Sequence, residues 1–334
     1  MAMHFLVLTS SMEKNIKIYV AGHHGLAGSA IVRELILQGF TNIVTRTHKQ
    51  LDLLDAAATH NFFKQEKPQV VFLAAAKVGG IHANNMFPVD FLMQNICIQT
   101  NVFQAAYQVG VDRLIFLGSS CIYPKDCPQP IKEEYLLTGP LEPTNRPYAL
   151  AKIAGVEMSW SYNRQHKTKW LAAMPTNLYG PGDNYDLETA HVLPALIRKM
   201  HEAKLVGSNE VNLWGSGTPR REFLYSDDLA RALIFLAFLD DQKYASLTSP
   251  SICPVINIGC GSDISIAELA NVIAQEVGYA GAFVHDRTKP DGTMQKRLDV
   301  SKLSALGWSQ TVPLADGIKT AYEAFLQNNL RAAA

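Results

Sequence analysis

The segment IKIYVAGHHGLAGSAIVRELILQG, residues 16–39, decides the fold. A β-branched apolar run is followed by Gly22, Gly25 and Gly28, and then by a helical stretch over residues 26–38. Glycines between a strand and a helix let backbone N–H groups approach a pyrophosphate and let the helix pack closely on the strand. The pattern favours dinucleotide binding over an ordinary glycine-rich turn.

The rest of the first half alternates strands with helices. Apolar runs at residues 69–76 and 113–120 flank a helical stretch around residues 91–108. Strands that are separated by helices form a parallel sheet with helices on both faces. The sequence therefore predicts an α/β fold with a doubly wound, Rossmann-like parallel sheet.

The chain is expected to divide into a cofactor domain and a smaller C-terminal substrate lobe. Residues 13–177, completed by part of residues 226–258, are predicted to bind the dinucleotide, and residues 178–334 mainly to bind substrate. Within the lobe, Ser265 and Glu268 have the spacing of a capping box before an apolar helix. We expect the ligand site between the two parts.

The composition favours small-molecule chemistry. The 334 residues are 48% hydrophobic and 18% charged, enough for a full core. Thirty basic residues balance thirty acidic ones without a Lys/Arg block, so we expect neither a nucleic-acid nor a membrane partner. The five cysteines lack metal-type spacing and predict free thiols, no metal site and a cytoplasmic protein.

Residues 1–12 are left out of the site prediction. They have a short apolar core, but no basic residue precedes it and no clear small-residue cleavage site follows. A signal peptide is therefore not expected, and Met12 is interpreted as an alternative start.

The residues after the second predicted strand bear on the choice of cofactor. An NAD site usually places an acidic residue about 20 residues beyond the glycines, on the ribose 2′-hydroxyl. Here that region reads TRTHK, and Arg46 and His48, together with His24, suit a 2′-phosphate. This favours NADP, the alternative being solvated residues at a strand end.

The segment PYALAK places Tyr148 and Lys152 on one helix face, just after a proline suited to a first helical turn. A lysine ammonium in that position is expected to lower the phenol pKa, and the phenol can protonate a carbonyl oxygen as hydride arrives. The predicted strand that ends in Ser119 and Ser120 adds a hydroxyl donor. Together these residues predict a carbonyl reductase.

Two further residues lie near the predicted site without a role in reduction. Cys121 follows the strand at the sheet edge where α/β ligands bind, and His191 precedes a predicted helix. Taken alone, a free cysteine is more often a small buried apolar residue, and a lone histidine more often structural.

Together with the glycine motif, a set of segments resembles the GDP-L-fucose synthase family of extended short-chain dehydrogenases/reductases. The segments are AAAKVGGIHANN, GSSCIYP, EPTNRPYALAKIAG, MPTNLYGP, WGSGTPRREF and KPDGT, in the family's order, and the similarity runs from about Lys14 to the C-terminal region. The resemblance implies a homodimer, built on two helices per subunit, that inverts C3 and C5 of GDP-4-keto-6-deoxy-D-mannose and reduces its C4 ketone with NADPH.

The resemblance also implies roles for the catalytic candidates. Cys121 and His191 match the base and acid of the two inversions. Tyr148 would stabilise the enolate and protonate the C4 oxygen, Lys152 would hold the nicotinamide ribose, and Ser119 would hydrogen-bond the carbonyl. Thiol and imidazole both titrate close enough to neutrality to exchange protons there.

By the same resemblance, two sets of residues bind the ligands. The NADPH/NADP+ set is Gly22, His23, His24, Gly25, Leu26, Ala27, Gly28, Arg46, His48, Asp52, Leu53, Leu117, Gly118, Ser120, Lys152, Pro175, Thr176, Asn177, Leu178 and His191. The GDP-sugar set is Lys199, Trp214, Arg221 and Asp291. The chain departs from the family at His24, His48 and Lys199, where relatives commonly carry arginine.

Two alternatives stay open. The first is a nucleotide-sugar 4,6-dehydratase or 4-epimerase, which would share the fold. A dehydratase typically has acidic residues after the strand-end serine, whereas SSCIYP has none. A 4-epimerase would not need Cys121 and His191. A non-catalytic NADP-sensing module would bind cofactor, yet it has no reason to keep Ser119, Tyr148 and Lys152 together.

Overall fold

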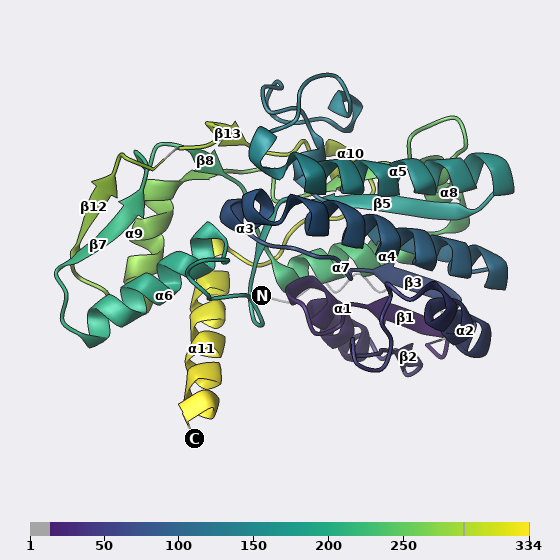
Figure 1. The fold of residues 1–334 in the computed structure, drawn as a ribbon, viewed down its shortest axis with the longest axis horizontal. Helices are drawn as coiled ribbons and strands as arrows, with labels where there is room; N and C mark the ends of the chain where they lie inside the picture. Colours follow the sequence, from purple (N-terminus) through teal and green to yellow (C-terminus); the bar gives the residue numbers. More distant parts are fainter. Residues whose placement is uncertain (1–13, 290, 334) are drawn as a thin grey trace.

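The computed structural model describes residues 14–289 and 291–333, so the segment around Met12 lies outside the described residues. Its central sheet has six parallel strands in the order β10-β5-β4-β3-β1-β2 (Figure 1). The strands are β1 (Ile18–Ala21), β2 (Ile43–Val44), β3 (Val70–Leu73), β4 (Arg113–Leu117), β5 (Lys169–Pro175) and β10 (Val255–Ile258). None of the helices in the described part is both long and apolar enough to cross a bilayer.

Helices cover both faces of this sheet (Figure 1). On one face lie α1 (Leu26–Leu37) and α7 (Ser226–Ala237); on the other lie α2 (Ala56–Glu66), α4 (Pro88–Val109) and α5 (Arg146–His166). The chain leaves β1 toward β2 on one side and then crosses to β3 on the other. The order therefore reverses at β1, and such a switch point forms a ligand crevice at the carboxyl ends of the strands.

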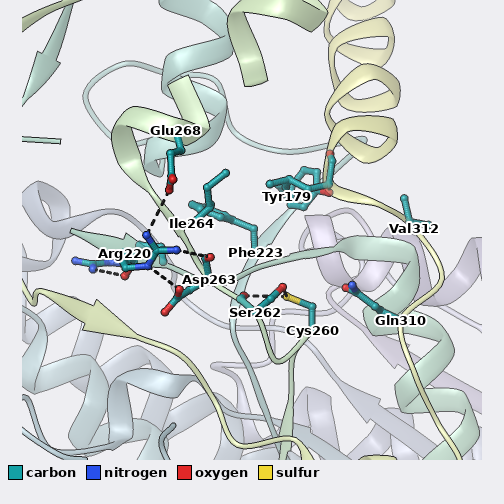
Figure 2. A pocket seen from close by; sticks show the side chains of 12 residues that line it. Tyr179, Arg220, Phe223, Cys260, Ser262, Asp263, Ile264, Glu268, Gln310 and Val312 are labelled. Atoms are coloured by element: carbon teal, nitrogen blue, oxygen red, sulfur yellow. Dashed lines mark hydrogen bonds and ion pairs between the residues drawn. The ribbon is translucent and has the colours of Figure 1, made fainter. Parts of the chain in front are cut away.

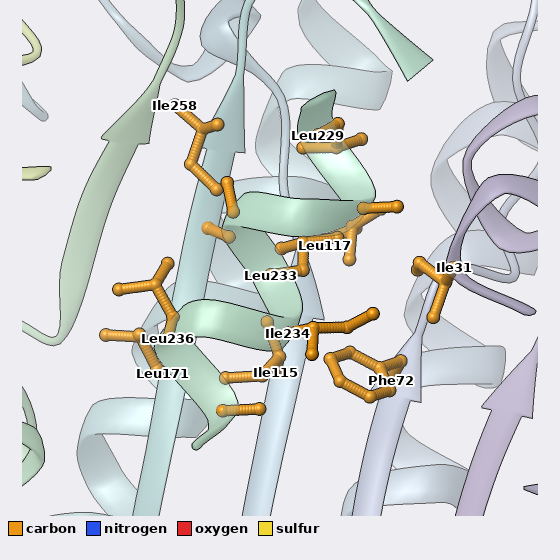
Figure 3. Close-up of a cluster of buried hydrophobic side chains, with 14 of the residues drawn as sticks. Ile31, Phe72, Ile115, Leu117, Leu171, Leu229, Leu233, Ile234, Leu236 and Ile258 are labelled. Carbon is orange, nitrogen blue, oxygen red and sulfur yellow. The ribbon is translucent and has the colours of Figure 1, made fainter. Parts of the chain in front are cut away.

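The strands read as continuous apolar runs because both of their faces are buried. Ile115 and Leu117 of β4 point into the cluster under α1 and α7, which Figure 3 shows, while Leu114 and Phe116 point into the cluster under α4 and α5. Successive strand residues alternate between faces, so one strand serves both clusters. Burying each such side chain stabilises the fold by about 1.5–3 kcal/mol.

The C-terminal lobe packs around a third apolar cluster. It is built mainly from α6 (Val192–Leu205), β7 (Glu210–Trp214), α9 (Ile266–Val277), β12 (Ala282–Asp286) and α11 (Leu314–Ala333). The capping box predicted at Ser265 and Glu268 is present at the start of α9. A three-stranded sheet of β8 (Arg220–Arg221), β11 (Ile264–Ser265) and β13 (Gln295–Lys296) links the lobe to the cofactor domain.

Short elements complete the fold. They are α3 (Ile81–Met86), η1 (Ser120–Ile122), η2 (Glu133–Tyr135), η3 (Pro143–Asn145), β6 (Asn177–Tyr179), β9 (Phe223–Tyr225), α8 (Asp241–Thr248) and α10 (Ser301–Ala305).

The predicted fold class is confirmed, with a doubly wound parallel sheet and the expected helices. One boundary differs: the strand expected over residues 113–120 ends at Leu117, because the Ser119 side chain caps a 3₁₀ turn instead of continuing the ladder. Strand β10 joins the sheet from the second half of the chain. The division into residues 13–177 and 178–334 stays a prediction.

Candidate active site

The turn after β1 is a cradle that only glycine fits. Gly22 has φ of 84°, and a Cβ there would lie 2.7 Å from the Ala75 nitrogen. A Cβ at Gly28 would lie 2.1 Å from the Gly22 oxygen, so helix α1 touches the turn itself. Gly25 caps α1 without a side chain, which leaves N–H groups for an anion. The cradle fits a dinucleotide pyrophosphate.

At the end of β4 the chain turns to place a hydroxyl and a thiol together. Ser119 is extended and its Oγ accepts a hydrogen bond from the Cys121 N–H at 3.3 Å. The Cys121 side chain is only 8% exposed. Burial raises the pKa of the Cys121 thiol, and the charge of Lys296, the Ser119 contact and the charge of Lys152 oppose that rise.

Helix α5 presents Tyr148 and Lys152 on one face toward the end of β4. Lys152 Nζ donates to the Leu117 carbonyl at 2.7 Å and lies 5.7 Å from the centre of the Tyr148 ring. Burial lowers the pKa of Lys152 to about 8, and the nearby Cys121 raises it. A lysine with that pKa exchanges protons near neutrality.

The expected lowering of the Tyr148 pKa by Lys152 is absent from this geometry. Burial raises the pKa of Tyr148 well above its ordinary value, and Cys121 raises it further. The physical reason is that the Lys152 ammonium donates to the Leu117 carbonyl while the phenol is removed from water. Tyr148 is therefore held as a neutral proton donor.

His191 lies on a separate element, as the N-cap residue of α6. The loop before it is fixed by Asp186, whose carboxylate accepts the Thr189 N–H at 3.0 Å, and the Thr189 carbonyl accepts the Gly80 N–H at 3.1 Å. Although part of its side chain is exposed, the surrounding protein lowers the pKa of His191. Once protonated, it gives its proton up readily.

The loop before His191 is connected to Tyr148 through the segment at residues 77–80 and Phe91, which the sequence analysis did not predict. The Phe91 ring lies edge-on to the Tyr148 ring, with centroids 6.2 Å apart, and a Cβ at Gly79 would lie 3.1 Å from Phe91. Asn95 fixes the segment at residues 77–80, because its side chain accepts from the N–H of Lys77 at 2.9 Å and donates to the carbonyl of Lys77 at 3.0 Å. The segment AAAKVGGIHANN was the signal, but its role was not assigned.

The residues predicted for the 2′-phosphate are engaged with protein groups. Arg46 Nη2 donates to Glu66 Oε1 at 2.5 Å, and the guanidinium lies 5.2 Å from the Phe62 ring centre. The other oxygen of Glu66 pairs with Lys17 at 3.3 Å. His48 is 78% exposed, with its Nδ1 3.7 Å from Asp52 Oδ1.

The rings of the two neighbouring histidines of the glycine turn contact each other at a tilt of 50°. The His23 and His24 rings have centroids 4.0 Å apart. Burial, and then the charge of His24, lower the pKa of His23, so His23 is neutral at neutral pH. Any positive charge for a phosphate must come from the other predicted residues.

The remaining cofactor residues lie around the carboxyl ends of the strands. Thr176 Oγ1 and Asn177 Nδ2 both donate to the Glu222 carbonyl, at 3.1 and 2.9 Å, which ties β5 to the substrate lobe. A Cβ at Gly118 would lie 2.1 Å from the methyl group of Met174, so any larger residue there would require the Met174 side chain to move. The others at these turns are Leu26, Ala27, Leu53, Ser120, Pro175 and Leu178.

The four predicted substrate residues gather on the lobe. Lys199 Nζ lies 5.3 Å from the Trp214 ring centre, and the indole side chain is 58% exposed. Asp291 accepts the Ser216 N–H at 2.6 Å and so fixes the loop after Trp214. A Cβ at the neighbouring Gly292 would lie 3.5 Å from Arg221 Nη2.

One lysine beside this set was not predicted. Lys289 Nζ lies 5.4 Å from the Trp214 ring centre, so two ammonium groups flank the indole. Its position in the KPDGT motif was the available signal.

A cavity of about 450 Å³ lies beside the linking sheet, as Figure 2 shows. Arg220 borders it and bonds Asp263 and Glu268, at 2.7 and 3.3 Å. Of the described residues, Arg221 lines it but none of the five predicted catalytic residues does. The candidate active site is therefore the group at the end of β4, where Ser119 and Cys121 lie beside the Tyr148 and Lys152 pair of α5.

Comparison with known proteins places this geometry among nucleotide-sugar enzymes. Residues 18–250 match the model of the NAD dependent epimerase/dehydratase family. The chain is 54% identical to GDP-L-fucose synthase 1 of Arabidopsis thaliana over 96% of each chain. It is 50% identical to GDP-L-fucose synthase of Escherichia coli (strain K12), over 94% of this chain and 98% of that one.

A solved structure agrees with these relatives. The crystal structure of a GDP-L-fucose synthetase from Naegleria fowleri bound to NADP has a TM-score of 0.86 and is 30% identical. The match covers 96% of this chain and 97% of that one.

Proposed function

The chain belongs to the NAD dependent epimerase/dehydratase family and, within it, to the GDP-L-fucose synthases; on this premise we propose that it converts GDP-4-keto-6-deoxy-D-mannose to GDP-L-fucose. The reaction inverts C3 and C5 and reduces C4, with NADPH as cofactor. One observation carries the proposal: the turn that holds Ser119 and Cys121 follows β4 directly, and Lys152, which lies beside the Tyr148 ring, donates to the last carbonyl of that strand. A base for epimerisation thus shares one site with the groups that serve a ketone.

Epimerisation needs a base and an acid beside a polarised ketone. Both inverted carbons are α to C4, so removing either proton puts charge on the C4 oxygen, which the Tyr148 and Ser119 hydroxyls would hydrogen-bond. We assign Cys121 as the base that takes the proton from one face. We assign His191, at the start of α6, as the acid that returns a proton to the other face.

Reduction uses the same oxygen. NADPH, when bound, supplies the hydride for C4. The neutral Tyr148 hydroxyl gives its proton to the C4 oxygen, which suits a group whose pKa burial has raised. Lys152 then restores that proton, because its pKa of about 8 lets it donate near neutrality.

We propose that the predicted ligand residues serve as the sequence implies. The cradle at Gly22 and Gly28 supports binding of the cofactor pyrophosphate. The cationic and aromatic surface of Lys199, Trp214 and Arg221 supports binding of the GDP moiety. The cofactor part would be residues 13–177 with part of 226–258, and residues 178–334 mainly the substrate lobe.

A cytoplasmic homodimer is part of the proposal. Four large apolar side chains of α4 and α5 are exposed, at 40–68%: Val89, Met93, Tyr107 and Leu150. Because α4 and α5 pack side by side, a second copy placed on this pair would cover these side chains.

The test is conversion of GDP-4-keto-6-deoxy-D-mannose with NADPH, followed by identification of the product. GDP-L-fucose is expected. A dehydratase or 4-epimerase would not consume NADPH stoichiometrically, and an NADP-sensing module would bind the cofactor without turnover.

A further inference from the structure

The proposed epimerisation, on which this inference rests, requires the Cys121 thiol to become a thiolate. Burial of the thiol works against this. Lys152, the nearest motif cation, already donates to the Leu117 carbonyl at 2.7 Å. A second positive charge near the sulfur would favour the thiolate.

Lys296 is placed to supply that charge by the register of the linking sheet. Strands β13 and β8 pair so that Gln295 lies beside Arg220 and Lys296 beside Arg221. Gln295 Nε2 donates to Asp263 at 2.6 Å. Arg220 donates to the same carboxylate, as Figure 2 shows. Successive strand residues point to opposite faces, so Lys296 points away from Asp263.

The chain after Lys296 runs along the loop that follows Cys121. The Ile131 N–H donates to the Arg297 carbonyl at 2.7 Å, and Ile131 forms a bridge with Leu298. Leu298 packs in one buried cluster with Ile122 and Tyr123. Because Lys296 lies two residues before Leu298 in extended chain, both side chains face the segment that carries Cys121.

The ammonium of Lys296 has no bonded counterpart among the described residues. Neither a hydrogen bond nor an ion pair joins its Nζ to the residues at 14–289 and 291–333, although the side chain is half-buried. The charged or titratable groups that act on it are Cys121, Arg221, Cys127 and Glu142. A half-buried cation beside another cation is costly unless an anion forms nearby.

We propose that Lys296 is a positioning residue that stabilises the Cys121 thiolate. Before the inversion, the thiol proton leaves to solvent. In the inversion, Sγ takes the proton from C3 or C5, the C–H electron pair becomes the enolate, and the ammonium keeps all its protons. The charge of Lys296 and that of Lys152 both lower the pKa of the thiol.

Alkylation of Cys121 by iodoacetamide at a series of pH values tests this without substrate. The rate is followed by mass spectrometry of the peptide that contains Cys121, since only the thiolate reacts. Lys296→Met should move the midpoint upward by about 1 pH unit or more, the scale of shift that a nearby opposite charge produces. Lys296→Arg keeps the charge and should leave the midpoint near the wild-type value.

Lys132→Met is the matched control, because Lys132 is 48% exposed and pairs only loosely with Glu134, at 3.9 Å. Its midpoint should not move, and thermal melting of each variant checks folding. In substrate without NADPH, Lys296→Met should also slow C3 and C5 hydrogen exchange about tenfold at neutral pH.

Two results would overturn the proposal: an unchanged midpoint in Lys296→Met, or a midpoint that Lys296→Arg shifts as far as Lys296→Met does. An unchanged midpoint with a raised KM for the keto-sugar would assign Lys296 to the substrate phosphates instead, beside Arg221. If Lys296→Met shifts the midpoint but the wild-type protein does not convert the keto-sugar, the role of Lys296 is supported and the proposed function is rejected.

Discussion

At the carbonyl end of the site, Lys152 and Lys296 lie near a buried thiol, and neither forms an ion pair within the described part of the chain. At the adenosine end, by which we mean the place where the 2′-phosphate of the cofactor is proposed to bind, Arg46 and Lys17 share the carboxylate of Glu66. The first region keeps its positive charge uncompensated, whereas the second neutralises part of it.

The contrast indicates that the first region serves proton transfer and that the second affects only the preference for NADPH over NADH. Unpaired charge in a buried place strongly favours any anion that forms there, such as a thiolate or an enolate. A charged side chain that already forms an ion pair near the surface binds a further anion only weakly, because the existing ion pair must be shared or broken. We therefore expect large effects from changes at the carbonyl end and small ones at the adenosine end.

The largest effect is expected at Tyr148. Tyr148→Phe removes the proton donor for the C4 oxygen, and NADPH oxidation with the keto-sugar should fall at least ~10²-fold. NADPH binding, measured by fluorescence titration, should stay near wild type. Tyr162→Phe is the control, since Tyr162 lies on the same helix but packs against Trp170. Near-normal turnover of Tyr148→Phe would exclude it as the donor.

A few-fold effect is expected at Glu66. Glu66→Gln releases Arg46 from its ion pair, so the preference for NADPH over NADH in kcat/KM should rise about 2- to 5-fold. Arg46→Met should lower the preference. Glu157→Gln, a change on α5 away from this ion pair, should leave it unchanged. A preference that falls in Glu66→Gln would mean that the carboxylate positions Arg46 for the phosphate.

The smallest effect is expected from the exposed histidines. Histidine loses its charge as the pH rises through ~6 to 8, so the NADPH preference should decline about 1.5- to 2-fold over that range. His23 contributes little to this because burial and His24 lower its pKa. In His48→Gln the decline should be weaker. A pH-independent preference in the wild type would exclude His24 and His48 as phosphate contacts.

Two pairs of side chains at the end of β4 could be predicted from the sequence, because the members of each pair are close in the chain. Tyr148 and Lys152 share one helix face, and Ser119 and Cys121 lie two residues apart, so short spacing fixes their geometry. The glycine cradle was predictable for the same reason. In each case the residues of the motif are the residues that contact one another, and they lie within about one turn of the chain.

The ion pair of Arg46 and the position of Lys296 were not predictable, because the groups that they meet are distant in sequence. The bond from Arg46 to Glu66 depends on how α2 packs beside β1, and Lys296 meets the Cys121 segment only through the pairing of β13 with β8. The raised pKa of Tyr148 likewise depends on burial, which a motif does not report. Tertiary packing decides which charges are neutralised.

The central claim is that one site holds two separable proton-transfer systems, and hydrogen exchange in D₂O tests it most directly. With keto-sugar and no NADPH, the wild type should replace the C3 and C5 hydrogens by deuterium. Cys121→Ser keeps the shape but replaces the thiol with a much weaker acid, so exchange at both carbons should stop.

On addition of NADPH, the same Cys121→Ser protein should still oxidise it slowly and yield a 6-deoxy sugar nucleotide with C3 and C5 unchanged. Ser119, Tyr148 and Lys152 remain in place for that step. Exchange and inversion at the wild-type rate in Cys121→Ser would contradict the account and make the thiol a packing residue.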